Sequence, residues 1–467
     1  MKVLFVNPPV VRSEHSSPIN NFKIDGFIFK LQSRKIRGLK RIFLLLHKYF
    51  GLGKGVRYGV RAGSRWPWTM SMPTEGSPNY PFFMGYAASL VEAEGHDVRL
   101  IDSVADEEYD YDEFLERVRA EKPDLIIQEC STPTIDIDLW VSEKLSKIAE
   151  VAVCGPHFTN DDIVSDVLRN HSHILYILKG EYILGAQELV RKMVPGVYEV
   201  NVVQDLEEIP FPFRSYPSAI NYFDPSMPTP KPQLQIYGSK GCPFKCTFCA
   251  WPQAMFMKKV VLRKPEHIAE EIRKALEIHS YKSIFFDDDT FNMGTERISK
   301  LCDHLKEIGL PWTMMGRLDI SPDWLYDKMI ESGCVGMRFG IETFNLEVLA
   351  NVKKGIERKD FKGTLERLSK KYPKLMLHIT MMKDMPGQTE EMHQLDMRIV
   401  HEMGFLSQDE SPKEMLRSFQ LSHCAPFPGT EMYEQMQASG DEKTIAILKD
   451  YRKHDGGQDT VMKALNE

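Results

Sequence analysis

The chain contains 467 residues, of which 42% are hydrophobic and 27% charged, and its formal net charge at pH 7 is −7. This composition is typical of a globular protein, and the length suits two or three domains rather than one. The acidic balance excludes binding to nucleic acid through a general basic field, so no nucleic-acid partner is expected. The eight cysteines lack the spacing of a disulfide framework, which favours a reducing, cytoplasmic setting.

Membrane signals are weak throughout the chain. The first apolar run is too short for a signal peptide and ends at Pro8-Pro9. No stretch provides the ~18 consecutive apolar residues that a membrane-spanning helix needs. A basic amphipathic pattern at residues 35–54 is compatible with a lipid surface, but such helices more commonly pack against their own protein. Membrane contact is therefore not expected.

Strand-like and helix-like patterns alternate through residues 1–205. Strands are expected at residues 3–6, 98–102, 124–127, 151–155 and 174–178, and helices at residues 81–92, 112–120, 136–149 and 161–168. A polar and basic insertion at about residues 11–75 interrupts the pattern after the first strand. Strands separated by helices predict an α/β fold, a doubly wound, Rossmann-like parallel sheet.

The predicted strands of this domain end in small, polar or turn-forming residues. In a doubly wound sheet these ends share one edge, where ligands bind. The residues at this edge are Asn7, Ser131, Thr132, Gly155, Pro156, His157, Gly180 and Glu181. Short polar loops of this kind also occur in any flavodoxin-like domain, so on their own they identify no ligand.

A second alternating region follows a proline-rich linker at residues 206–232. Strands are expected at residues 233–237, 283–287, 312–315, 335–341, 375–381 and 416–421, and helices at residues 266–278, 294–307, 322–331, 360–371 and 389–402. Six such units predict an open, partial (β/α)6 barrel over residues 233–430, with functional residues at the carboxyl ends of its strands. Residues 431–467 are expected to form a short helical tail.

Three cysteines lie in the loop after the first barrel strand. Cys242, Cys246 and Cys249 have C-x3-C-x2-C spacing within a segment that contains glycine and proline. Three thiolates at this spacing suit a 4Fe–4S cluster in which one iron has no protein ligand and is open to chemistry. The alternative is a three-cysteine zinc site with a fourth ligand from elsewhere, although the chain offers no second C-x2-C pair.

This loop, with Phe248 before the third cysteine, resembles the signature of the radical S-adenosylmethionine (SAM) enzymes. In that family the open iron binds the amino and carboxyl groups of SAM, which is reductively cleaved to a 5′-deoxyadenosyl radical. The preceding domain resembles the cobalamin-binding domain of cobalamin-dependent radical SAM enzymes, through its N-P-P, G-H-x-V-x-L-I-D, K-P-D-L-I-I, C-G-P-H and K-G-E runs. The resemblance implies that its strand-end residues contact cobalamin. Because D-x-H-x-x-G is absent from the sequence, it also implies no histidine beneath the cobalt.

Further motifs of the same family follow the later barrel strands. The resemblance implies that Asp288 and Asp289, in a D-D-x-F run, receive the ammonium of SAM. It implies that Arg317, in an R-x-D run, binds the SAM carboxylate, and that Glu342, in a G-I-E-T run, binds hydroxyls or the ammonium. The acidic pair has the alternative of a divalent metal site or a helix cap. Arg317 has the alternative of a structural salt bridge to Asp319 or to Glu342.

The expected function is methyl transfer from methylcobalamin to an unactivated carbon, or phosphorus, of a small natural-product-type substrate. The class B cobalamin-dependent methyltransferases are the family members that the chain resembles. The resemblance implies an external electron donor such as flavodoxin or ferredoxin. Two alternatives remain open: a non-methylating relative that performs cyclisation, ring contraction or oxidation, and a non-catalytic cobalamin or iron–sulfur sensor. The sequence predicts no catalytic side chain beyond the cofactor contacts.

Overall fold

The computed structural model describes residues 1–9, 11–13, 56–60, 69–71, 79–106, 108, 111–224, 226–256, 258–356, 360–407, 416–439, 441–454 and 461–466. The chain folds into two compact units. The first comprises residues 1–203, 210–219 and 449–458, and the second comprises residues 204–209, 220–448 and 459–467. The basic helix expected at residues 35–54 lies outside the described residues.

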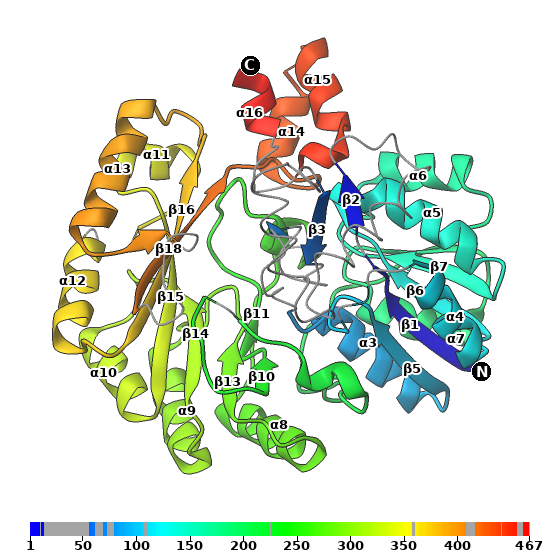
Figure 1. The fold of residues 1–467 in the computed structure, drawn as a ribbon, viewed down its shortest axis with the longest axis horizontal. Coiled ribbons are helices and arrows are strands. Elements are labelled where there is room, and N and C mark those ends of the chain that lie inside the picture. The colour runs from blue at the N-terminus through cyan, green and yellow to red at the C-terminus, as the bar shows by residue number, and fades with distance from the viewer. Residues whose placement is uncertain are drawn as a thin grey trace, which may run out of the picture. The chain divides into compact units, whose positions relative to one another are not determined.

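The first unit contains a six-stranded parallel sheet (Figure 1). Its strands, in spatial order, are β5 (Asp97–Asp102), β1 (Lys2–Asn7), β6 (Leu125–Glu129), β7 (Glu150–Cys154), β8 (Tyr176–Lys179) and β9 (Gly196–Glu199). The strand order reverses at β1, which pairs with β5 on one side and with β6 on the other. Ligands of doubly wound sheets bind at this reversal, beyond the carboxyl ends of the strands.

Helices cover both faces of this sheet. They are α3 (Phe82–Ala93), α4 (Tyr111–Glu121), α5 (Ile135–Leu145), α6 (Asp161–Asn170) and α7 (Ile183–Lys192). Helices α4, α5 and α6 contribute to one apolar cluster with Leu4, Val6 and Ile126 of the sheet. Helices α3 and α7 pack against each other, and α3 contacts β1 and β5. The predicted doubly wound fold is confirmed, and α7 and β9 add a fifth helix and a sixth strand that the sequence patterns did not indicate.

A small antiparallel sheet lies within the insertion after the first strand. It consists of β2 (Val11–Ser13), β3 (Val56–Val60) and β4 (Thr69–Ser71). Beyond the sheets of the first unit, a 3-10 turn named η1 (Thr132–Thr134) opens α5, and η2 (Pro217–Ile220) follows the proline-rich segment.

The second unit is an open barrel of parallel strands. In spatial order these are β10 (Gln233–Ile236), β13 (Ser283–Phe286), β14 (Trp312–Gly316), β15 (Cys334–Glu342), β16 (Met376–Lys383), β18 (Arg417–His423) and β17 (Leu406–Ser407). The intervening helices are α8 (Pro265–Ile278), α9 (Thr295–Ile308), α10 (Asp323–Glu331), α12 (Phe361–Lys371) and α13 (Glu390–Glu402). At the two edges of the sheet, β10 pairs with β13 and β17 pairs with β18. The two edge strands do not pair with each other, so the barrel is not closed.

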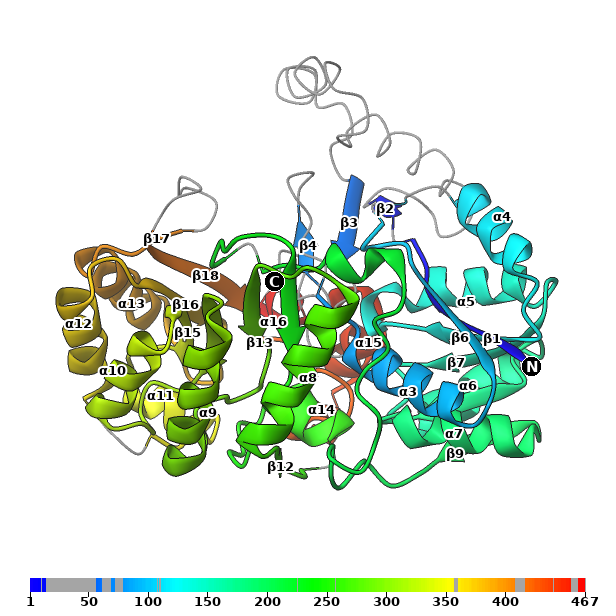
Figure 2. The ribbon, with the colours of Figure 1, turned by 90° about the horizontal axis from the view of Figure 1, so that it is seen from below.

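The two faces of this sheet differ in chemistry. Apolar side chains such as Ile284, Met337 and Ile379 form one core with the helices, and α8, α9 and α10 lie in front of the strands in Figure 2. Side chains alternate along a strand, so their neighbours in sequence point to the opposite face. That face carries glutamine, threonine, arginine, histidine and serine.

Short elements complete the second unit and the C-terminal region. They are β11 (Ser239–Lys240), β12 (Val261–Leu262), the π-helical turn η3 (Trp251–Met255), α11 (Leu346–Asn351), α14 (Glu431–Gln437), α15 (Glu442–Lys449), the 3-10 turn η4 (Tyr451–Lys453) and α16 (Val461–Asn466). The tail contributes to both units, because residues 449–458 pack with the first and its flanking segments with the second. None of the helices in the described ranges combines the length and apolar content that crossing a membrane requires.

Candidate cofactor site

The three cysteines lie in a loop that follows β10 at the carboxyl end of the barrel strands. Gly241, just before Cys242, has φ of +81°, and a Cβ atom at this position would lie 2.0 Å from the carbonyl oxygen of Lys259. Only glycine fits where the loop passes this close to the backbone after η3. Steric contacts of the backbone therefore define the conformation of the loop at Gly241 without a metal.

Two of the predicted carboxylates hold this loop by its backbone. Strand β13 ends at Phe286, one residue before the predicted end, and Asp288 and Asp289 lie in the following loop. The fully buried Asp288 accepts hydrogen bonds from the backbone N–H of Gly238, at 2.9 Å, and from Ser239 Oγ. Asp289 accepts from the N–H of Gly241 at 3.1 Å. Contact of either carboxylate with SAM stays a prediction.

Gln253 in η3 holds the cysteine loop from the other side. Its Nε2 donates to the carbonyl oxygens of Cys246, Thr247 and Cys249 at 2.9, 3.2 and 2.9 Å. Its Oε1 accepts from the N–H of Glu431 at 2.9 Å, at the start of α14. Motif spacing gave no indication of this role, because the contacts depend on the π-helical turn.

Phe248 anchors the loop through apolar contacts. Its ring packs against a small buried cluster that consists of Val348, Val352, Met385, Cys424 and Met432. The adjacent Thr247 donates its N–H to the carbonyl of Val352 at 2.9 Å. This cluster connects the cysteine loop to three other parts of the unit: α11, α14 and the turn that precedes α13. In the structure Phe248 thus has a packing role, and its predicted contact with a cofactor is untested.

Electrostatics at the cysteines favour a positively charged ligand. Burial raises the pKa of all three thiols, and for Cys246 and Cys249 the neighbouring sulfurs raise it further. Lys354 and Arg317 oppose this at Cys246. Three adjacent thiolates require compensating charge, and iron supplies it. Within the described ranges, no three His, Cys, Asp or Glu side chains are grouped as the ligands of a single ion would be.

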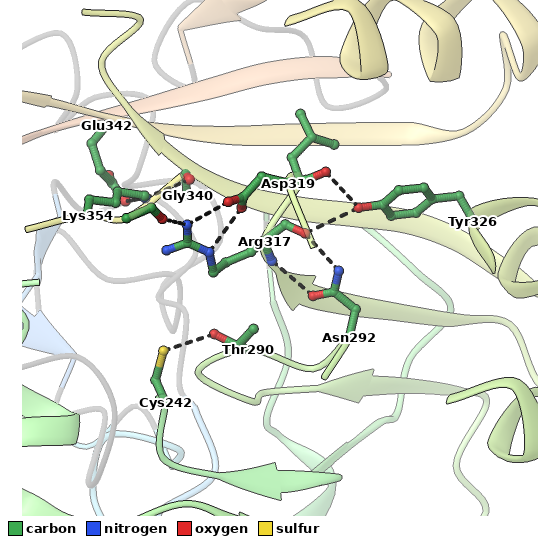
Figure 3. A network of polar contacts seen from close by, with 11 residues as sticks. Cys242, Thr290, Asn292, Arg317, Asp319, Tyr326, Gly340, Glu342 and Lys354 are labelled. Atoms are coloured by element: carbon green, nitrogen blue, oxygen red, sulfur yellow. Dashed lines mark hydrogen bonds and ion pairs between the residues drawn. The ribbon is translucent and has the colours of Figure 1, made fainter. Parts of the chain in front are cut away.

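Arg317 forms a network at the end of β14 (Figure 3). Its Nε and Nη2 donate to the two carboxylate oxygens of Asp319 at 3.0 and 2.8 Å, and Nη2 also donates to the carbonyl of Gly355. The guanidinium carbon lies 3.7 Å from the centre of the Phe244 ring, within the cysteine loop. The structural salt bridge that the sequence left as an alternative is therefore formed. Binding of the SAM carboxylate stays a prediction.

Glu342 forms a buried ion pair at the end of β15. Lys354 Nζ donates to Glu342 Oε1 at 2.7 Å and to the carbonyl of Gly340 at 2.8 Å (Figure 3). Glu342 has φ of +67°, and the register between β15 and β16 shifts there. A non-glycine residue in the left-handed region is strained, and strain of this kind concentrates at functional sites. Contact of Glu342 with SAM stays a prediction.

In the first unit, one group of predicted residues lies at the strand reversal. Asn7 Nδ2 donates to Asp102 Oδ1 at 2.9 Å, whereas the buried Asn7 Oδ1 has no hydrogen-bond partner among the described residues. Ser131 and Thr132, after β6, are also buried at the next strand end. An orphaned acceptor beside two hydroxyl residues fits a ligand that carries amide donors, as the corrin side chains of cobalamin do.

A second group lies around the turn after β7. Gly155 has φ of +114°, and a Cβ atom there would lie 2.2 Å from the carbonyl oxygen of Cys130. Pro156 is half-buried, whereas His157 is buried beneath Tyr451 of η4, with 4.8 Å between ring centres. Burial and the neighbouring His454 lower the pKa of His157 to about 3, so its imidazole is neutral.

The remaining predicted residues follow β8. Gly180 has φ of +69°, and Glu181 Oε1 accepts from the N–H of Val203 at 2.8 Å. The structure thus brings Asn7, Ser131 and Thr132 to adjacent strand ends. The C-terminal segment covers His157, and Glu181 bonds the chain beyond β9. Contact of any of these residues with cobalamin is untested.

An open (β/α) barrel with a three-cysteine loop after its first strand defines the class of the second unit. Residues 236–398 match the family model of the radical SAM superfamily, so this unit is a radical SAM domain. Domains of this superfamily hold a 4Fe–4S cluster and SAM, as predicted.

Two curated relatives extend across much of the chain. An uncharacterized methyltransferase of Pyrococcus horikoshii is 25% identical over 406 residues, which cover 81% of this chain and 82% of the relative. The cytidylyl-2-hydroxyethylphosphonate methyltransferase of Streptomyces wedmorensis is 23% identical over 343 residues, covering 59% of this chain and 63% of that enzyme.

Two solved structures share the fold of both units. The radical SAM methyltransferase TsrM of Kitasatospora setae, with tryptophan and a SAM analogue bound, has a TM-score of 0.58 at 15% identity, over 78% of this chain and 74% of TsrM. The cobalamin-dependent SAM radical enzyme OxsB, with aqua-cobalamin and SAM bound, has a TM-score of 0.51 at 15% identity, over 82% of this chain and 55% of OxsB. The predicted architecture is thereby confirmed.

Proposed function

We propose that this chain is a cobalamin-dependent radical SAM methyltransferase that acts on a small-molecule substrate. One observation carries the proposal: the same chain contains a three-cysteine loop on a radical SAM barrel and a doubly wound sheet. At the strand ends of that sheet, the buried Asn7 Oδ1 has no hydrogen-bond partner among the described residues. The relatives named above are methyltransferases, and TsrM and OxsB combine the same two folds.

In this proposal Cys242, Cys246 and Cys249 hold the cluster. When bound, the cluster supplies the electron that cleaves SAM reductively and thereby starts radical chemistry. Asp288, Asp289 and Gln253 keep the loop backbone in place, so its order does not depend on the sulfurs. Cys242 Sγ lies 3.3 Å from Thr290 Oγ1. The chain's contribution is thus a preformed geometry, which spares the cost of ordering the loop when the cofactors bind.

Glu342 is proposed to receive the ammonium of SAM. It already binds one ammonium group, that of Lys354, so its position and charge suit another. For SAM to bind in this way, Lys354 must share or release the carboxylate. Arg317 is proposed to stabilise the loop through Phe244, with a secondary contact to the SAM carboxylate.

Asn7, Ser131 and Thr132 are proposed to contact cobalamin at the strand reversal of the first unit. The orphaned Asn7 Oδ1 is available to accept a hydrogen bond from an amide of the corrin side chains. His157 is proposed to have no contact with the cobalt, because Tyr451 covers its ring. This agrees with the absence of a D-x-H-x-x-G motif. The electron donor is proposed to be an external flavodoxin or ferredoxin.

The test is an anaerobic reconstitution of the full chain with iron, sulfide and cobalamin, followed by incubation with a reductant and SAM that carries a trideuterated methyl group. Mass spectrometry should find 5′-deoxyadenosine and the deuterated methyl group on the cobalamin. A chain that binds both cofactors but produces neither product would be a sensor, and the proposal would fail. Cleavage of SAM without methyl transfer to cobalamin would favour a non-methylating relative.

A further inference from the structure

The barrel face opposite the helices carries a band of buried and half-buried polar side chains that the cofactor site does not use. Interiors of closed (β/α) barrels are filled mainly by valine, isoleucine and leucine. Here the residues on this face are Gln235, Thr313, Arg338, His378, Thr380, Ser418 and Gln420. Met315, Arg338, His378 and Ser418 are register partners on four adjacent strands, so they form one row across the sheet.

Some polar atoms of this band have hydrogen-bond partners within the protein. Arg338 Nη2 donates to Asp224 Oδ1 at 2.6 Å, and Ser226 contacts the same nitrogen. His378 Nδ1 lies 2.9 Å from Ser418 Oγ. The Asp224 segment thus binds one end of the guanidinium and neutralises its charge.

The other part of the band is not satisfied. Thr313 Oγ1, Arg338 Nε and His378 Nε2 are buried and have no hydrogen-bond partner among the residues that the structure describes. Thr313 and His378 are both 0% exposed. Buried polar groups of this kind almost always have partners, since leaving one unpaired destabilises the fold. Three such atoms on neighbouring strands therefore call for a partner that the described residues do not supply.

Two glycines on either side of Arg338 let neighbouring side chains pack closely against β15. Gly336 and Gly340 are on the same face of β15, on either side of Arg338. A Cβ atom at Gly336 would lie 3.0 Å from Thr313 Cγ2, and one at Gly340 would lie 2.7 Å from Glu342 Oε1. Thr380 Oγ1 lies 3.4 Å from Glu342 Oε2, which connects the band to the proposed SAM contact.

We infer that Thr313, Arg338 and His378 form a binding site for the oxygen-bearing polar end of the small-molecule substrate. Arg338 Nε–H is a donor only, and the Thr313 hydroxyl and the His378 imidazole complete a set that a carbonyl, carboxylate or hydroxyl oxygen satisfies. An ammonium group does not suit the site, because it has no acceptor for the Arg338 Nε–H. That the ligand of this site is the substrate rests on the proposed function.

The first test is a stability comparison on the anaerobically reconstituted full chain. Thr313→Val removes the hydroxyl without a change of shape, and its melting temperature should equal or exceed that of the wild type. The matched control is Thr343→Val, because the buried Thr343 Oγ1 does have a partner, Asp396 Oδ2 at 2.6 Å. That variant should melt about 2–4 °C or more below the wild type. An equal loss in both variants would overturn the inference.

The second test probes the chemistry of the ligand with acetamide, acetate and methylammonium, measured by saturation-transfer NMR. Acetamide or acetate should bind at millimolar concentration, and methylammonium should not. Arg338→Lys retains a cation for Asp224 but removes Nε, and it should weaken binding of the oxygen probe about tenfold. Unchanged binding in Arg338→Lys, or preferential binding of methylammonium, would contradict the inference. Neither test requires turnover, so its failure is distinguishable from failure of the proposed function.

Discussion

The guanidinium of Arg317 lies 3.7 Å from the centre of the Phe244 ring while two of its nitrogens bind Asp319. The arginine is 6% exposed, so this stacking is shielded from water. It connects the end of β14 to the cysteine loop after β10. Arg317 thus makes a cation–π contact with Phe244 of the cysteine loop, a role that motif comparison alone does not suggest.

Phe244→Leu should loosen the cysteine loop. The substitution retains an apolar side chain but removes the ring, and a shielded cation–π contact contributes about 1–2 kcal/mol. Amide hydrogen exchange at residues 242–249 of the metal-free chain should therefore accelerate about tenfold. Tyr372→Leu removes a ring that faces Lys371 on the barrel surface and serves as the control. Equal exchange in wild type and Phe244→Leu would mean that the stacking does not order the loop.

Gln253→Glu should prevent stable cluster assembly. The amide nitrogen of Gln253 donates to three loop carbonyls, and a carboxylate at the same place would repel them. We expect the iron content after reconstitution to fall to less than about half that of the wild type. Gln394→Glu is a suitable control, because Gln394 donates to Glu390 in an exposed part of α13, away from the cysteine loop. Full iron content in Gln253→Glu would show that this residue does not hold the loop.

Lys354→Met should destabilise the barrel strongly in the absence of SAM. The side chains of Lys354 and Glu342 are 6% and 11% exposed, so removal of one partner leaves a buried charge without compensation. Loss of one partner of a buried pair costs about 3–5 kcal/mol, and the double variant Lys354→Met with Glu342→Gln should lose less.

The same variant tests the proposed role of Glu342. SAM should raise the melting temperature of Lys354→Met more than that of the wild type, because its ammonium replaces the missing cation. Thermal unfolding with and without SAM measures both effects. A smaller SAM-dependent shift in Lys354→Met would count against binding of the ammonium by Glu342.

Acidification should loosen the contact between the C-terminal segment and the first unit. The pKa of His157 is lowered from 6.5 to about 3, so the unfolded state binds a proton more readily between these values. The stability that this neutral, buried ring confers is complete above pH ~6.5 and decreases as the pH falls toward ~3, by about 2 kcal/mol at pH ~5. His157→Phe retains the ring packing, so its melting temperature should decline less than that of the wild type between pH ~7.5 and ~5. Parallel declines in the two proteins would exclude His157 as the titrating group.

The sequence allows the fold and the cluster loop to be predicted because both depend on local patterns. The spacing of Cys242, Cys246 and Cys249 indicates their function, and a buried strand such as β1 is visible as an apolar run. The order of the βα units then places every strand end at one edge of its sheet.

The residues that sequence reasoning missed act through contacts between distant segments. Gln253 contacts the start of α14, and Tyr451 contacts His157, which is far away in the sequence, so neither contact has a local signal. Helix α7 and strand β9 were also missed; β9 is an edge strand with one buried residue among four, so it has no apolar run. For Arg317 the sequence left two possible partners, Asp319 and Glu342, and for Glu342 it did not indicate Lys354. A motif does not specify which partner a charged side chain binds.

The central claim is that this chain uses an iron–sulfur cluster on Cys242, Cys246 and Cys249 to cleave SAM. The direct test is iron analysis and product detection on the anaerobically reconstituted full chain, with Cys246→Ala in parallel. The wild type should contain about four irons per chain and form 5′-deoxyadenosine from SAM on reduction, and the variant should do neither. A wild type with no cluster and no cleavage, or a Cys246→Ala variant that retains both, would contradict it.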